Sequence, residues 1–304
     1  MAADNSALIR DITALKMEKK AVVLAHNYQL GEVQDIADYV GDSLELARIA
    51  AETDAEVIVF CGVHFMAETA SILCPDKKVL LPDLNAGCPM ADMISAGDLR
   101  EMKKEIPGAK AVCYVNTTAE VKAECHICCT SANAVKVIES LPAGEIIFVP
   151  DQYLGKYVES RTGRRMHLWP GFCPTHARIK PDDIVDLRRD YPKAKVIVHP
   201  ECRPEVIALA DEALSTGGIC RYARESEAQE IIVGTEIGII YRLKKENPGK
   251  KFIPISEQAI CPNMKLITLE KIRGCLRVMA PEVSVSDEIR KKASASVDRM
   301  LKVT

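Results

Sequence analysis

An internal repeat with a period of roughly 86 residues constrains the fold of this chain more than any other feature. Three segments each begin with a helical pattern, continue through a basic or Pro/Gly turn and end in a short apolar strand. They are IRDITALKMEKKAVVLAHNYQ, LREMKKEIPGAKAVCYVNTTAE and IVDLRRDYPKAKVIVHPECRPE. The polar residues at the strand ends, His26, Asn116 and His199, are 90 and 83 residues apart. Two further apolar strands follow in each segment, so each copy reads strand–helix–strand–helix–strand.

Short apolar strands that alternate with helices predict an α/β fold of parallel sheets with right-handed crossovers. Uninterrupted apolar runs such as AVVLA and KVIVH fit strands that are buried on both faces. We expect a C-terminal helical tail to pack back on the first unit. Because ligands bind at the carboxyl ends of parallel strands, a shared site is expected where the three units face one another. We place the three units and the tail at residues 1–94, 95–180, 181–268 and 269–304.

One cysteine in each unit follows the third strand and precedes a proline. These residues, Cys88, Cys173 and Cys261, are 85 and 88 residues apart and so keep the period of the repeat. Proline fixes a rigid turn, which suits a loop that presents a ligand, and thiolates are soft metal ligands. A cubane iron–sulfur cluster with one iron free of cysteine and a zinc ion with a water ligand are both compatible with three thiolates. Buried structural cysteines remain a third explanation, which the repeated Cys-Pro pattern disfavours.

The segment ECHICC contains a CxxC motif that is typical of redox or zinc sites. The eight residues TTAEVKAE separate it from its strand, whereas a thioredoxin-like motif follows its strand directly. No second CxxC completes a zinc knuckle. We therefore expect Cys125, Cys128 and Cys129 to be structural.

Polar pairs stand two residues apart where the first strand of each unit ends. They are His26 and Tyr28, Tyr114 and Asn116, and His199 and Glu201. Histidine, tyrosine and glutamate can transfer protons, whereas tyrosine and asparagine can also bind a carboxylate or stabilise an enolate-like oxygen.

Hydroxyl residues begin the next helix of each unit. Ser43, Ser131 and Thr216 are 88 and 85 residues apart. They are either simple helix caps or groups that hold carboxylate or phosphate at a helix N-terminus. The sequence STGGI, which begins at Ser215, is the strongest candidate, because its glycines allow the backbone to approach an anion closely. The chain has no GxGxxG and no GxxxxGK[ST], so a dinucleotide or ATP cofactor is not expected.

Composition argues against several other functions. The net charge is −3, and the chain has one Trp and five Phe, so neither a basic face nor a stacking platform for nucleic acid is indicated. The N-terminus lacks the apolar core of a secretory signal, and the apolar runs are too short to cross a bilayer. We therefore expect a cytoplasmic protein with no nucleic-acid or membrane partner.

Ordered motifs across most of the chain resemble those of the quinolinate synthase family. They are AHNYQ, GDS, CGVHFMAE, AGCPMAD, YVNTTAEVKAE, CCTSANA, PDQYLGKYV, HPEC, STGGI, EIGI and CPNMK. The resemblance implies three homologous three-layer αβα units, arranged with pseudo-threefold symmetry around one [4Fe–4S] cluster. It implies that Cys88, Cys173 and Cys261 bind this cluster and that one iron has no protein thiolate.

The same resemblance implies condensation of iminoaspartate with dihydroxyacetone phosphate to give quinolinate, phosphate and water, a step of NAD biosynthesis. An aspartate oxidase or dehydrogenase would supply the labile iminoaspartate. Glu201 is expected to be the general base, with Tyr28, His199 and His26 assisting. The residues implied to bind substrate are His26, Ser43, Tyr114, Asn116, Ser131, His176, His199, Glu201, Ser215 and Thr216. A different cluster-dependent hydro-lyase and a non-catalytic iron–sulfur redox protein are the alternative functions.

Overall fold

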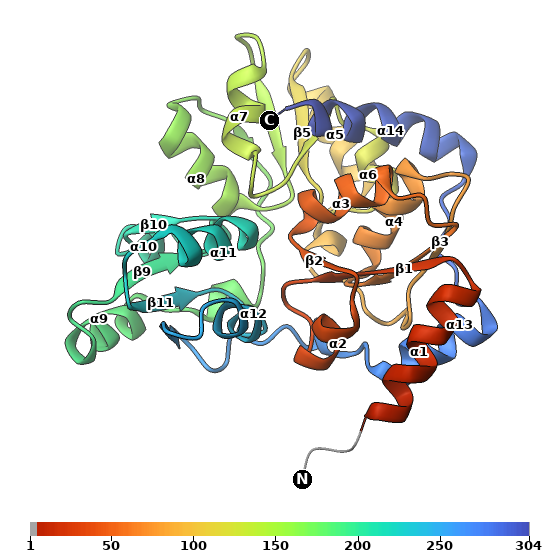
Figure 1. Ribbon diagram of the computed structural model, residues 1–304. Coiled ribbons are helices and arrows are strands. Elements are labelled where there is room, and N and C mark those ends of the chain that lie inside the picture. Colours follow the sequence, from red (N-terminus) through yellow and green to blue (C-terminus); the bar gives the residue numbers. More distant parts are fainter. Residues whose placement is uncertain (1–4, 304) are drawn as a thin grey trace.

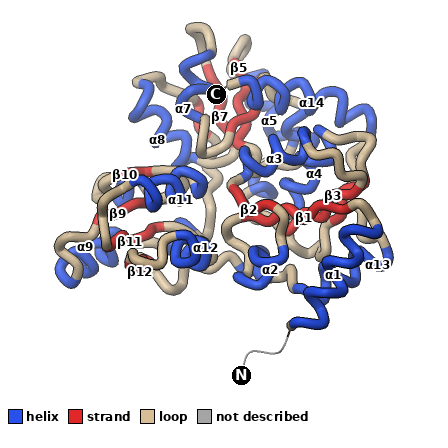
Figure 2. Tube along the Cα trace, in the orientation of Figure 1, coloured by secondary structure: helices blue, strands red, loops and turns tan. Residues whose placement is uncertain are grey.

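The computed structural model describes residues 5–303, which form three parallel four-stranded sheets flanked by helices (Figures 1 and 2). The strand orders are β2-β1-β3-β4, β6-β5-β7-β8 and β10-β9-β11-β12. Every strand pair is parallel, and the first strand of each sheet lies between the second and the third. The predicted α/β class with three short parallel sheets is therefore confirmed.

The first sheet is built from the N-terminal third of the chain. Its strands are β1 (Ala21–His26), β2 (Tyr39–Gly41), β3 (Val57–Cys61) and β4 (Lys78–Leu80). Its helices are α1 (Ser6–Glu18), α2 (Gly31–Ile36), α3 (Ser43–Glu52) and α4 (His64–Leu73), followed by the 3₁₀ helix η1 (Ala91–Met93). Five of the six residues of β1 are buried, as expected for a strand with helices on both faces.

The second sheet has the same arrangement. Its strands are β5 (Lys110–Tyr114), β6 (Ile127–Cys129), β7 (Ile146–Val149) and β8 (His167–Leu168). Its helices are α5 (Ala96–Glu105), α6 (Ala119–Ala123), α7 (Ala134–Ser140) and α8 (Gln152–Thr162), followed by η2 (His176–Arg178).

The third sheet again has the same arrangement, and its strand β9 contributes side chains to two separate cores. Its strands are β9 (Lys195–Val198), β10 (Glu212–Ala213), β11 (Glu230–Gly234) and β12 (Lys251–Pro254). Its helices are α9 (Pro181–Asp190), α10 (Pro204–Ile207), α11 (Thr216–Glu225) and α12 (Ile239–Glu246), followed by η3 (Pro262–Lys265). Within β9, Ile197 packs into the large core shared with the other sheets, whereas Val196 and Val198 pack into a separate smaller core. Successive side chains of a strand point to opposite faces, so one strand serves both cores.

Each unit has one strand more than the sequence pattern predicted. The additional strands β2, β6 and β10 lie between the first predicted strand and the hydroxyl residue that begins the next helix. They have the sequences YVG, ICC and EA, which are too short to show a strand periodicity. The strand ICC contains part of the CxxC motif, which is therefore sheet structure.

The two C-terminal helices divide between the first two units, whereas we expected both to pack on the first. Helix α13 (Leu269–Val278) lies beside α1, where Arg273 pairs with Asp11 at 3.5 Å (Figure 1). Helix α14 (Asp287–Lys302) instead packs mainly on α6 and β6 and also contacts α4. The hydroxyl of Ser296 donates a hydrogen bond of 2.8 Å to the carbonyl of Lys122 at this contact. Within residues 5–303, no helix has the length and apolar character that a membrane span requires.

Candidate active site

Loops from the carboxyl ends of all three sheets line one cavity of about 70 Å³, which we call the inner cavity. It contains all but one of the residues that the sequence predicted for a site. These are His26, Tyr28, Ser43, Cys88, Tyr114, Asn116, Ser131, Cys173, His176, His199, Glu201, Thr216 and Cys261. The repeat therefore has a structural consequence: equivalent strand ends of three sheets supply one site.

The three cysteines reach the inner cavity from the loops that follow β4, β8 and β12. Each thiol is free, and each cysteine is partly exposed, unlike the other nine cysteines, which are buried. Burial of the sulfur atoms raises the pKa of Cys88 to about 12 and raises the pKa of Cys173 and of Cys261. The nearby Glu201 carboxylate raises the pKa of Cys88 and Cys173 further. These thiols would therefore become thiolates at neutral pH only beside a strong positive charge, as a metal centre supplies.

Glu201 is the acceptor at the centre of the site. Its Oε1 accepts a hydrogen bond of 2.5 Å from the Tyr114 hydroxyl, and its Oε2 lies 2.7 Å from Nδ1 of His176. Burial opposes ionisation of Glu201, but the neighbouring His176 and His199 rings and the Tyr114 hydroxyl outweigh it and lower the pKa. The carboxylate is therefore held ionised in a site that is closed to bulk water.

A chain of hydroxyl and imidazole groups continues from Glu201. Because a carboxylate only accepts hydrogen bonds, Nδ1 of His176 donates to Glu201. Nε2 of His176 hydrogen-bonds to the Thr235 hydroxyl at 2.8 Å, and the Tyr28 hydroxyl hydrogen-bonds to the same Thr235 oxygen. The sequence Tyr28–Thr235–His176–Glu201 thus forms a continuous buried path for orienting or moving a proton.

The other two histidines are neutral. Burial lowers the pKa of His26 and of His199 from 6.5 to about 3. Nδ1 of His199 accepts from the backbone N–H of Glu201 at 3.3 Å, so its Nε2–H donates to Ser131 Oγ at 3.1 Å. The rings of His199 and His176 are stacked with centroids 4.8 Å apart. Neutral His26 and His199 can accept or donate hydrogen bonds but carry no charge at neutral pH.

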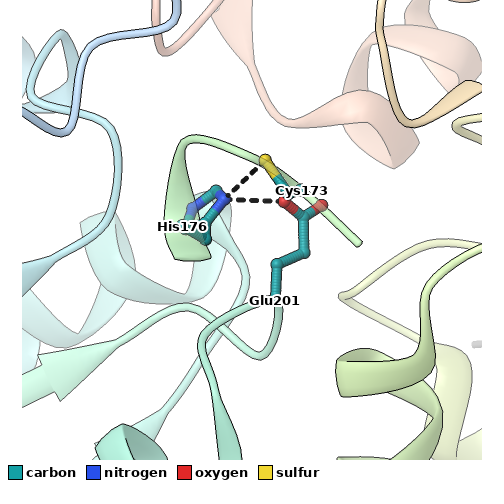
Figure 3. Close-up of side chains that lie close together, drawn as sticks. All are labelled: Cys173, His176 and Glu201. Carbon is teal, nitrogen blue, oxygen red and sulfur yellow. Dashed lines mark hydrogen bonds and ion pairs between the residues drawn. The ribbon is translucent and has the colours of Figure 1, made fainter. Parts of the chain in front are cut away.

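Cys173, His176 and Glu201 form the compact group that is able to hold a single metal ion (Figure 3). Their ligand atoms all lie within 4.8 Å of one another, and His176 Nδ1 is 3.1 Å from Cys173 Sγ. Among residues 5–303, the three predicted cysteine ligands do not form such a compact group with one another. This separation fits thiolates at different corners of a larger centre better than three thiolates on one ion.

Asn116 places an unpaired hydrogen-bond acceptor at the inner cavity. Its side-chain oxygen is buried and has no hydrogen-bond partner within residues 5–303, although it lines the inner cavity. A buried unpaired acceptor is costly, so this atom is suited to a donor group of a bound molecule.

Ser215 is the predicted residue that does not line the inner cavity; it lies in an adjoining cavity. Its hydroxyl donates to Asp42 Oδ2 at 3.1 Å and accepts from the backbone N–H of Gly218. The glycines of STGGI do permit close approach to an anion, but this anion is the carboxylate of Asp42. A Cβ on Gly217 would lie 2.7 Å from Asp42 Oδ2 and 3.0 Å from Glu45 Oε1.

Three polar residues at the site were not predicted from the sequence. Thr235 and Glu236 follow β11, and Asp42 precedes α3. The fully buried Glu236 accepts a hydrogen bond of 3.2 Å from the backbone N–H of Cys261 and pairs with Lys265 at 2.9 Å. Glu236 does follow the period of the repeat, because Cys61, Asp151 and Glu236 are 90 and 85 residues apart.

The CxxC segment lies away from the inner cavity. Cys125, Cys128 and Cys129 are buried, and Cys128 Sγ lies 3.4 Å from Cys113 Sγ in the neighbouring strand. Burial raises the pKa of Cys113, Cys128 and Cys129, so these thiols are protonated and unreactive.

Three parallel α/β sheets around a buried cavity of cysteines, histidines and a glutamate define an α/β enzyme with a candidate metal centre. The family model described as quinolinate synthetase A protein matches residues 10–302. The chain therefore belongs to the quinolinate synthetase A family, an enzyme family of NAD biosynthesis.

Curated relatives agree over nearly the whole chain. A quinolinate synthase of Dehalococcoides mccartyi strain CBDB1 is 66% identical over 292 residues, which cover 96% of this chain and 97% of that protein. Quinolinate synthases of Geotalea uraniireducens and Methanoregula boonei are 57% and 54% identical over 293 and 299 residues. The alignments cover 96% and 98% of this chain and 96% and 99% of those proteins, respectively.

Proposed function

We propose that this chain condenses iminoaspartate with dihydroxyacetone phosphate, giving quinolinate, phosphate and water. One observation carries the proposal beyond family membership. The inner cavity combines cysteines from three loops with a buried, ionised glutamate that is hydrogen-bonded to tyrosine and histidine. A non-catalytic redox protein would have no use for this second set of groups.

The cofactor in this proposal is one [4Fe–4S] cluster held by Cys88, Cys173 and Cys261. The residues present fit such a group, because three free thiols line one cavity and are too far apart to form a compact single-ion group. When bound, the iron without a protein thiolate supplies a Lewis acid.

Glu201 is the proposed general base. It is ionised and held by Tyr114 and His176, so it can take a proton from a substrate carbon or nitrogen in the inner cavity. Burial raises the pKa of Tyr28 and Tyr114 well above 10, so both phenols keep their protons and can donate them to a departing or developing oxygen. Neutral His26 and His199 act as hydrogen-bonding partners that orient substrate.

The remaining polar groups are proposed to bind the anionic parts of the substrates. Ser43, Ser131 and Thr216 stand at or beside the starts of three helices, where the helix dipole and free N–H groups favour carboxylate or phosphate. Asn116 offers an unpaired oxygen to a donor group of the substrate. Because iminoaspartate is labile, an aspartate oxidase or dehydrogenase is the proposed upstream partner.

The test is a coupled assay on anaerobically purified protein. Aspartate oxidase generates iminoaspartate in the presence of dihydroxyacetone phosphate, and mass spectrometry detects quinolinate. Wild type should form product, whereas Cys173→Ser should lose both product and iron. The matched variant C129S changes a buried cysteine away from the cavity and should retain iron. An anaerobic, iron-loaded wild type that forms no quinolinate would refute the proposal.

A further inference from the structure

A second cavity of about 190 Å³ adjoins the inner cavity, and we call it the outer cavity. At the starts of α3 and α11, and just before α7, one residue lines the inner cavity and the next residue lines the outer cavity. The steps are Ser43 to Leu44, Ser131 to Ala132 and Thr216 to Gly217. Asp42 lines both cavities, and the hydrogen bond from Ser215 to Asp42 lies where they meet.

One cation from the helix that follows each of these steps lines the outer cavity. Arg48 belongs to α3, Lys136 to α7 and Arg221 to α11. They follow the hydroxyl residues Ser43, Ser131 and Thr216 by the same interval along the sequence. In α3 and α11 five helical residues advance about 7.5 Å, so Arg48 and Arg221 stand beyond their hydroxyls, away from the inner cavity. Lys136 lies in the first turn of α7, which begins three residues after Ser131.

These cations have few partners in the protein. Arg48 Nη2 reaches the carbonyl of Leu301 at 3.5 Å. No hydrogen bond or ion pair joins Lys136 or Arg221 to another residue of the chain between 5 and 303.

The two carboxylates of the outer cavity are engaged elsewhere. Asp42 Oδ1 accepts from the backbone N–H of Leu44, and Glu45 Oε2 accepts from the backbone N–H of Asp42 at 2.9 Å. Both carboxylates form the N-terminal capping box of α3, whereas the three cations are not engaged with them. The outer cavity is lined by three cations and two carboxylates, so its net charge is positive, although the net charge of the whole protein is −3.

We propose that the outer cavity captures small dianions, phosphate esters or dicarboxylates, before they pass between the helix starts into the inner cavity. The inference rests on the proposed function, in which both substrates are dianions of these two kinds. A cleft with a net positive charge raises the local concentration of anions and speeds their association.

Protection of Lys136 from acylation tests capture without using activity. Isotope-labelled acetic anhydride is applied to the holoenzyme in inorganic phosphate, in succinate or in chloride, all at one ionic strength. Mass spectrometry compares Lys136 with Lys156, an exposed lysine outside the cavity. A ligand at roughly twice its dissociation constant should slow acylation of Lys136 about threefold and leave Lys156 unchanged. The anion that protects at lower concentration identifies the captured chemistry.

The variant Arg221→Gln should reduce this protection, and Lys156→Gln should not. In kinetics, Lys136→Glu should lower kcat/KM by about tenfold at low salt, and added salt should shrink the difference. Equal acylation of Lys136 in phosphate, succinate and chloride would overturn the capture site, even if quinolinate is formed. Protection of Lys136 in a chain that forms no quinolinate would refute the proposed function and leave the capture site standing.

Discussion

The carboxylate of Glu201 lies 2.7 Å from Nδ1 of His176, and both side chains are almost completely buried. The two residues come from different loops: His176 begins η2 after β8, and Glu201 follows β9. Their contact therefore joins the second and third units at the inner cavity, beside the thiol of Cys173 (Figure 3).

Replacing Glu201 with glutamine tests its role as base. Gln keeps the size, but its single carbonyl oxygen can accept from only one of Tyr114 and His176, and it cannot take a proton. We expect turnover to fall by about 10² to 10⁴ while iron and sulfide content stay at the wild-type level. The matched variant E257Q, on an exposed residue, should be fully active. Near-normal turnover of Glu201→Gln would exclude the glutamate as base.

Thr235 provides the shorter link between Tyr28 and His176, so Thr235→Val should weaken the path without changing the side-chain shape. Removal of the hydroxyl leaves Tyr28 and His176 only their direct contact at 3.4 Å, and loss of the two shorter hydrogen bonds should cost about 1–3 kcal/mol each in unfolding free energy. We expect lower stability in urea unfolding and a fall in kcat that Thr235→Ser restores. If the Val variant keeps wild-type kcat, Tyr28 acts without this path.

Glu236 should position Cys261, since its carboxylate accepts from the backbone N–H of that cysteine. Glu236→Ala removes the acceptor and is expected to lower iron and sulfide content per chain. Glu236→Gln retains an acceptor oxygen and should recover most of the iron. Iron analysis under anaerobic conditions checks both variants; equal, full loading of the Ala variant would contradict the positioning role.

Stability should fall as pH falls below 6.5. The folded-state pKa of His26 and His199 is about 3, against 6.5 in the unfolded chain, so only the unfolded chain takes up these protons between those values. Each ring should then contribute a loss of about 1.4 kcal/mol per pH unit in unfolding free energy across this window. Urea unfolding at a series of pH values measures the slope, and His26→Gln should make it shallower. A wild-type slope in that variant would show that His26 is not buried neutral.

Much of the site could be predicted because its residues follow the period of the repeat. Cys88, Cys173 and Cys261 share one spacing, and parallel strands bring equivalent carboxyl ends to one edge. Glu236 kept the same spacing, but the equivalent residues are Asp151 and Cys61, so the position showed no single chemistry and was given no role. Thr235 is visible only in three dimensions, because its partners Tyr28 and His176 are distant in sequence.

Three other features of the structure could not be predicted from sequence patterns, each for a physical reason. The strands β2, β6 and β10 are too short for alternation to register. The amphipathic pattern of α14 indicates an apolar face but not the unit that covers it, and the chain places that face mainly on α6 and β6. The Ser215 hydroxyl was expected to meet substrate, but it is used by Asp42 across the contact between the first and third units.

The most direct test of the account is metal and acid-labile sulfide analysis of the anaerobically purified protein. We predict about four irons and about four sulfides per chain, lost together when Cys88, Cys173 or Cys261 is replaced by serine. One zinc per chain without sulfide, bound through Cys173, His176 and Glu201, would contradict the proposed cluster.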